Sequence, residues 1–252
     1  LTSFLFLIIA LSNTVSAQTS QEFWFAPPVI TANHAGKTPI YLRITSGNAA
    51  ADVTISQPAN PGFVPIIVAV PANSTLTQDL SAFVAQLETP SNDMVNNTGL
   101  HIVSTSDITC YYELSPTNNP DIWALKGANG LGTEFYVPVQ NIWPNGSYLP
   151  ERPYTSFDIV ATEDNTVVSI YPKTDLDFGH PALQAYTIFL DEGQTYSGSV
   201  GKFDLAILPS ENPAGTVIVS NNNIAVSIKD DSVNPTGYGG CRDMMGDQIV
   251  PT

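Results

Sequence analysis

The chain has few basic residues and few charges of any kind. Among its 252 residues, 8 are Lys or Arg and 23 are Asp or Glu, which gives a net charge of −15. Charged residues make up 12% of the chain, about half the ~25% usual in soluble domains. Lys and Arg hold nucleic-acid backbones, so this acidic chain disfavours a nucleic-acid partner. The shortage of Lys and Glu, common residues of exposed helices, also disfavours helical bundles and coiled coils.

Cysteine is scarce as well. Cys110 and Cys241 are the two cysteines, too few for a disulfide scaffold. A bond between them is one possibility. However, the strand pattern described below places Cys110 at a core position, which favours a small buried side chain instead.

Hydrophobic runs long enough to cross a membrane are absent from the sequence. The apolar run Phe4–Leu11 is shorter than the ~20 residues that span a bilayer. Its length suits a signal peptide, and Val15-Ser16-Ala17 has the small-residue form of a cleavage site. We therefore predict a signal peptide over residues 1–17, incomplete because an initial Met and a basic start are missing. The exported mature chain would begin at Gln18, and a buried N-terminal strand is the alternative.

Motifs of catalysis and cofactor binding are missing too. The three histidines accompany no G-x-S-x-G nucleophile motif, and the His and Cys residues lack zinc-ligand spacing. Glycine-rich nucleotide loops and the H-E-x-x-H motif are also absent from the sequence. The sequence therefore predicts a protein that is not an enzyme and has no cofactor.

The chain does contain two copies of one pattern of short strands and polar turns. In the clearest match, Ile102-Val103-Ser104 aligns with Ile218-Val219-Ser220, and Ile108 aligns with Ile224. The matching segments, in order, are 40–57 with 156–171, 65–81 with 185–200, 99–114 with 215–230, and 132–139 with 246–252. Alternating strands between Gly, Pro, Asn and Asp turns are typical of antiparallel sheets.

The repeat predicts an all-β fold of two tandem antiparallel β-sandwich-like units with one short helix. A β-propeller-like arrangement is the alternative. The predicted segments are the signal peptide 1–17, an N-terminal extension 18–39, a first unit 40–143, a linker 144–154, and a second unit 155–252 that is truncated at its C-terminus. The helix is expected near 79–88, where apolar residues recur at helical spacing.

Alternation also predicts which side chains of the two longest matching strands face a core. The predicted inward residues are Ile224, Val226 and Ile228 in the second unit and Ile108, Cys110 and Tyr112 in the first. The predicted outward residues are Ala225, Ser227 and Lys229.

Aromatic residues near the predicted linker are the candidate ligand-binding residues. Trp143, Tyr148 and Tyr154 lie in or beside the segment between the units, where loop residues often contact a ligand. Packing of the two units against each other is the alternative role. No metal site is predicted, because Asp favours turns for backbone reasons alone. The weak candidates for hard-cation ligands are Asp230, Asp231, Asp243 and Asp247.

Three groups of residues resemble a known family. They are Gly132–Pro138 (GTEFYVP), Phe157–Thr166 (FDIVATEDNT), and the C-terminal set Cys241, Asp243, Gly246-Asp247-Gln248 and Pro251. The chain resembles the N-terminal domain family of IgG Fc-binding protein over most of residues 40–252, in particular bacterial members in large secreted proteins. The resemblance implies an extracellular, β-rich, non-enzymatic module, accompanied by further domains of the same polypeptide. It assigns no residue to an Fc contact.

These observations predict a secreted or cell-surface adhesion or binding module, part of a larger extracellular protein. Its expected ligand is an extracellular glycan or protein. A carbohydrate-binding accessory domain or an extracellular glycoside hydrolase is the alternative, and the hydrolase requires two carboxylates facing a cleft. A structural spacer in a long surface protein is a third interpretation.

Overall fold

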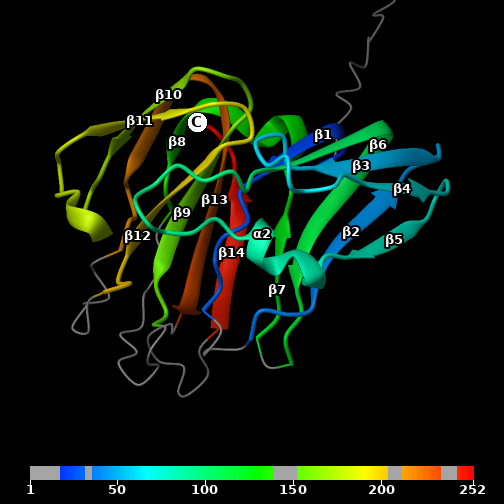
Figure 1. Ribbon diagram of the computed structural model, residues 1–252, viewed down its shortest axis with the longest axis horizontal. Coiled ribbons are helices and arrows are strands. Elements are labelled where there is room, and N and C mark those ends of the chain that lie inside the picture. Colours follow the sequence, from blue (N-terminus) through cyan, green and yellow to red (C-terminus); the bar gives the residue numbers. More distant parts are fainter. Residues whose placement is uncertain (1–17, 32–35, 118, 139–151, 204–211, 234–242) are drawn as a thin grey trace, which may run out of the picture.

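The computed structural model describes residues 18–31, 36–117, 119–138, 152–203, 212–233 and 243–252. These residues form an all-β fold of two seven-stranded antiparallel sheets, which confirms the predicted fold class. Figure 1 shows the sheets side by side, the first at the right and the second at the left. Each sheet is curled around an apolar core of its own.

The first sheet is built around one long strand. Its strands are β1 (Ser20–Phe25), β2 (Ile40–Ser46), β3 (Ala51–Ser56), β4 (Ile66–Val70), β5 (Thr75–Asp79), β6 (Leu100–Leu114) and β7 (Asp121–Ala124). The order is β4-β3-β6-β2-β5, and β1 and β7 also pair with β6. Because Ile102 of β6 lies opposite both Phe23 and Ile55, β1 and β3 flank the same stretch of β6 from its two edges.

The second sheet repeats this arrangement strand for strand. Its strands are β8 (Leu131–Tyr136), β9 (Thr155–Ala161), β10 (Thr166–Tyr171), β11 (Tyr186–Leu190), β12 (Thr195–Val200), β13 (Val217–Val233) and β14 (Asp243–Ile249). The order is β11-β10-β13-β9-β12, and β8 and β14 also pair with β13. The repeat in the sequence therefore corresponds to a repeat of structure. From here on, the first unit is the first sheet, β1 to β7, with its connecting segments, and the second unit is the second sheet, β8 to β14.

One pair of segments that match in sequence does not correspond in the structure. Residues 132–139 match 246–252 in sequence, but Phe135 of β8 lies opposite Ile218 just as Phe23 of β1 lies opposite Ile102. The counterpart of β8 is therefore β1. The counterpart of β14 is β7, because each follows the long strand and pairs with its C-terminal half. β8 falls within 40–143, the range predicted for the first unit, but it pairs in the second sheet.

The two cores contain the residues that alternation places there. The buried residues are Ile108, Cys110 and Tyr112 in the first core and Ile224, Val226 and Ile228 in the second. Cys110 is 1% exposed, and burial raises the pKa of its thiol. It therefore packs as a small apolar side chain, while Cys241 lies outside the described residues.

The predicted helix near 79–88 is confirmed as a short element. A 3-10 turn, η1 (Ser81–Phe83), continues into α2 (Val84–Leu87), and Leu80 and Leu87 are buried in the first core. Two further 3-10 turns are η2 (Gly127–Gly130) and η3 (Asp177–Gly179). Within the described ranges, no helix combines the length and the apolar character needed to span a membrane.

The outward residues of β13 are the exception to the predicted pattern. Ala225, Ser227 and Lys229 point away from the second core, but none is more than 1% exposed. Their predicted outward direction is confirmed, but they do not face solvent because the first unit covers this face. Ser227 Oγ, for example, donates to the carbonyl of Ala26 at 2.6 Å. Alternation separates the two faces of a strand, but it does not reveal what packs on the second face.

Candidate functional site

The first unit packs on the outer face of β9 and β13, and we call this contact the junction. Its apolar part is formed by Trp24 of β1 against Val160 of β9 and Ala225 of β13. Trp123 of β7 also reaches the second sheet, where its Nε1 donates to the carbonyl of Ile228 at 3.0 Å. Both edge strands of the first unit that pair with β6 therefore contribute a tryptophan to the junction.

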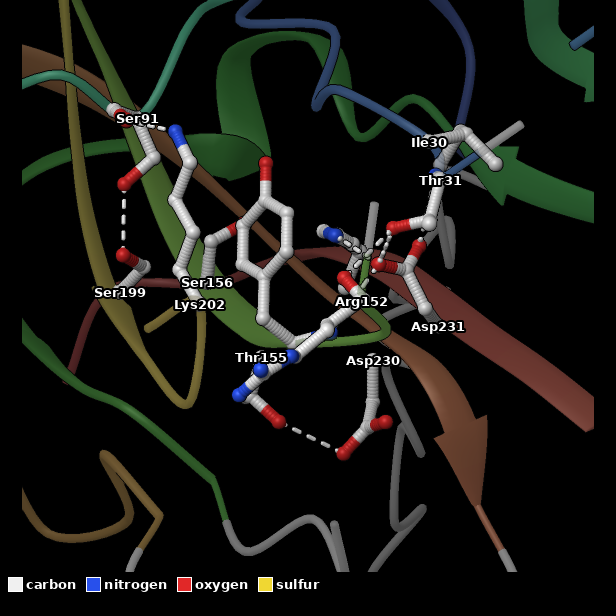
Figure 2. A network of polar contacts seen from close by, with 12 residues as sticks. Ile30, Thr31, Ser91, Arg152, Thr155, Ser156, Ser199, Lys202, Asp230 and Asp231 are labelled. Atoms are coloured by element: carbon white, nitrogen blue, oxygen red, sulfur yellow. Dashed lines mark hydrogen bonds and ion pairs between the residues drawn. The ribbon is translucent and has the colours of Figure 1, made fainter. Parts of the chain in front are cut away.

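A buried ion pair lies at the centre of the junction. Lys229 Nζ lies 2.6 Å from Asp231 Oδ2, and both side chains are 0% exposed. The Asp231 carboxylate also accepts hydrogen bonds from the backbone N–H of Thr31 at 3.3 Å and of Tyr154 at 3.1 Å, and from the Thr31 hydroxyl. Figure 2 shows Thr31 and Asp231 facing each other. Because Thr31 precedes β2 and Asp231 lies in β13, one carboxylate links the two units.

Tyr154 lies directly beside this ion pair. Its ring centroid is 3.3 Å from Lys229 Nζ, which is a close cation–π contact. The side chain is 4% exposed. Burial, helped by the negative charges of Asp231 and Asp158, raises the pKa of the phenol well above its usual range. Tyr154 is therefore a neutral ring that packs against a buried ammonium group.

A second chain of polar contacts crosses the junction near β12. Lys202 Nζ donates to the carbonyl of Ser91, and Ser91 Oγ donates to Ser199 Oγ at 2.6 Å. Ser199 Oγ donates in turn to Asp177 Oδ2 at 2.6 Å. Figure 2 shows Ser91, Ser199 and Lys202 gathered on the side of the network away from Asp231. The segment that follows α2 is therefore tied to the second sheet by side chains as well as by packing.

Asp158 is the titratable carboxyl of β9 at the junction. Its side chain is 0% exposed, and Ser156 Oγ donates to its Oδ2 at 2.8 Å. Burial raises the pKa of the carboxyl to about 7, against the opposing effects of serine hydrogen bonds and the Lys229 charge. The protonation state of Asp158 therefore changes near neutral pH.

The buried groups of the junction have the character of a structural contact. Asp158, Lys229 and Asp231 are at most 1% exposed, so they give a substrate little access. Across the described ranges, no group of three or more His, Cys, Asp or Glu residues is arranged to hold a metal ion. The role of this network is to attach one unit to the other.

A different part of the second sheet presents large apolar side chains to solvent. We call Tyr136, Tyr171, Val217, Val167 and Phe189 the open face. Tyr171 of β10 and Tyr136 of β8 both lie opposite Val217 of β13, so the three form one row across the sheet. Phe189 of β11 lies opposite Val167 of β10 on the same face, and the Ser169–Thr187 pair separates this second row from the first.

The aromatic rings of the open face are unusually accessible. Tyr136 is 51%, Tyr171 48% and Phe189 70% exposed. A hollow of about 310 Å³ adjoins Phe189, and its other lining residues are Asn165, Val167, Leu190 and Asp191. The row of Tyr136, Val217 and Tyr171 is the kind of contiguous, exposed apolar surface that marks interaction sites, and tyrosine is enriched among the residues that dominate binding energy at protein interfaces. The open face is therefore the candidate functional site.

Comparison with known proteins places the open face in a recognised module. A family model described as IgGFc binding protein matches residues 123–252, which is 252 − 122 = 130 residues and more than half of the chain. The chain belongs to the IgG Fc-binding protein family. A search of curated proteins finds no match. The family segment contains all seven strands of the second sheet, β8 to β14, and hence the entire open face.

The structure describes one of the three residues predicted to bind a ligand. Trp143 and Tyr148 are outside the described residues, and Tyr154 lies in the junction. Ligand binding by these three stays a prediction. Sequence reasoning missed the open face, although one signal was available. In the run GTEFYVPV, Phe135 alternates with Tyr136, so a buried Phe135 requires Tyr136 to face the other way.

Each weak candidate for a metal ligand whose side chain the structure describes already has a partner within this chain. Asp231 is paired with Lys229, as described above. Asp230 Oδ2 accepts a hydrogen bond from Thr155 Oγ1 at 2.7 Å. Asp247 forms an ion pair with Lys126 at 3.0 Å. Asp243 lies in β14, and its side chain is outside the described part of the structure.

Proposed function

We propose that this chain is a non-catalytic, extracellular module that binds a protein ligand through the open face of its second sheet. The observation that carries the proposal is the row of Tyr171, Val217 and Tyr136, with Phe189 farther along the same face, on the solvent side of the family segment. Family membership supports both an extracellular location and a protein ligand. The secreted or cell-surface adhesion role, the bacterial origin and the further domains suggested by the sequence belong to the same proposal.

The arrangement of the carboxylates supports binding rather than hydrolysis. A glycoside hydrolase needs two carboxyl groups facing a cleft that admits a sugar. Asp158 and Asp231 instead face the junction, where the first unit covers them. A glycan ligand is the alternative for the open face, because tyrosine rings also stack on sugars.

We expect the double variant Tyr171→Ala with Phe189→Ala to bind a protein ligand about 30- to 1,000-fold more weakly, because truncating each aromatic side chain costs about 1–2 kcal/mol. The family description names IgG Fc, so immobilised Fc fragment is the first probe, with affinity measured by surface plasmon resonance. A glycan array with the same proteins tests the other ligand class. Both side chains are exposed, so we expect folding to be preserved.

Ile67→Ala is the matched control. Ile67 lies on β4, the counterpart of β11 in the first sheet, and it is 73% exposed but outside the family segment. This variant should bind with wild-type affinity. Unchanged affinity of the double variant would exclude the open face as the site. Loss of glycan binding in the double variant, with no binding to proteins, would favour a carbohydrate-binding role.

A further inference from the structure

The junction shows how one unit of this fold docks on another. The edge strand β1 of the first unit turns Trp24 toward the second sheet, where it contacts Val160 and Ala225. Trp24 is 3% exposed, because it packs in this cluster and because its indole ring also stacks on His101 of its own sheet, with ring centroids 3.9 Å apart. Val160 and Ala225 lie opposite each other in neighbouring strands β9 and β13, so they form a small apolar platform for the indole ring. The docking element is thus an edge-strand aromatic, and the receiving element is a cross-strand pair.

The second unit carries an unused copy of the docking element. Trp24 lies opposite His101 in β6, one residue after the Phe23–Ile102 pair. Tyr136 lies opposite Val217 in β13, one residue after the equivalent Phe135–Ile218 pair. Tyr136 therefore occupies the position of Trp24. It is 51% exposed, because the described structure places no third unit on this edge.

The first unit carries an unused copy of the receiving element. Val160 and Ala225 lie next to the Ala161–Ile224 pair. In the first sheet, Thr45 and Thr109 lie next to the equivalent Ser46–Ile108 pair. Both threonines are half-buried on the outer face of their sheet, and their methyl groups can support an aromatic ring as Val160 and Ala225 do.

Each molecule therefore has one free docking element, in the second unit, and one free receiving element, in the first unit. We propose that the partner of the Tyr136 edge is a second copy of this chain, whose Thr45–Thr109 pair receives the tyrosine ring. This inference rests on the proposed function, since it uses one edge of the open face, and it names the partner. The contact joins different surfaces of the two molecules, so it continues as a head-to-tail chain rather than closing as a dimer.

The association is expected to be weak, because the covalent tether that holds the two units of one chain together is missing. Sedimentation velocity of the purified chain over about 10–500 µM covers the range of such contacts. We expect the weight-average mass to rise with concentration beyond that of a dimer. A chain that remains monomeric over this range, or that stops at a dimer, overturns the proposal.

Two single variants provide the decisive comparison. Tyr136→Lys removes the docking element, and Thr109→Lys removes the receiving element at the other end of the molecule. Each variant alone should stay monomeric. An equimolar mixture should form a one-to-one complex and nothing larger, because each variant retains the element that the other has lost. The mixture also shows that both variants are folded.

Ile67→Lys is the control for adding a charge to an exposed apolar site, and it should associate like the wild type. Association of Tyr136→Lys and Thr109→Lys at the wild-type level, or no complex in their mixture, contradicts the proposal. The test is separate from that of the proposed function. The chain could be monomeric while its binding to Fc or to another ligand still depends on Tyr171 and Phe189. That result would refute the self-association and leave the proposed binding role intact.

Discussion

Lys229→Met is expected to lower the free energy of unfolding by about 3–5 kcal/mol, because it leaves the buried Asp231 carboxylate without its cation. The methionine fills the volume of the lysine stem, so the loss comes mainly from the uncompensated charge. Denaturant titration followed by tryptophan fluorescence measures it, since Trp24 and Trp123 both report on the junction. Adding Asp231→Asn should recover part of the loss, because both buried charges are then gone.

An exposed ion pair provides the comparison for this prediction. Arg43 Nε lies 2.6 Å from Glu113 Oε2 on the outer face of the first sheet, and the Arg43 side chain is 38% exposed. Arg43→Met should cost about 1 kcal/mol or less, as is usual for surface pairs. If Lys229→Met and Arg43→Met cost the same, burial gives the Lys229–Asp231 pair no greater effect on stability than an exposed pair has.

Asp158→Asn is expected to change how stability depends on pH. The pKa of Asp158 is about 7 in the folded chain and near the ordinary value of 3.8 when unfolded. The folded state therefore holds this proton more tightly, and the wild type loses stability as pH rises from about 4 to 7. At about 1.4 kcal/mol per pKa unit, the difference between wild type and variant shifts by up to about 4 kcal/mol in favour of the variant.

The measurement is the free energy of unfolding of both proteins at several pH values between about 4 and 8. Asp79→Asn is the control, because the contribution of Asp79 to stability should depend on pH in the opposite direction. Hydrogen bonds from Ser81 lower the pKa of the exposed Asp79 carboxyl, so its contribution is lost as pH falls. A constant difference between wild type and Asp158→Asn across the range would show that Asp158 does not titrate near neutrality.

The core residues could be predicted from the sequence because alternation identifies them in the second unit and the internal repeat transfers the assignment to the first. Ile108, Cys110 and Tyr112 could be assigned by their match to Ile224, Val226 and Ile228, whose apolar alternation is unambiguous. Packing within one sheet depends on residues that are near in the strand pattern, so local periodicity is sufficient to find it.

The junction could not be predicted in this way, because it depends on which face of one sheet meets the other. Lys229 in an outward strand position normally indicates solvent. Its partner Asp231 lies two residues away, on the same side of β13, and small residues such as Ala225 precede it. This combination of a charge pair with small neighbours was the available signal for a covered polar face. The open face was missed for a related reason, since the exposure of Tyr136 and Tyr171 depends on whether another element packs on that face, which local periodicity does not show.

The most direct test of the account is hydroxyl-radical footprinting of the chain, free and bound to a protein ligand, beginning with the Fc fragment. In the free chain, Tyr136, Tyr171 and Phe189 should be oxidised readily, and the buried Trp24 and Tyr154 should be protected. Binding should protect the open face and leave the other exposed residues unchanged. Protection of Trp143 and Tyr148, with Tyr136, Tyr171 and Phe189 oxidised as before, would contradict the open face as the binding site.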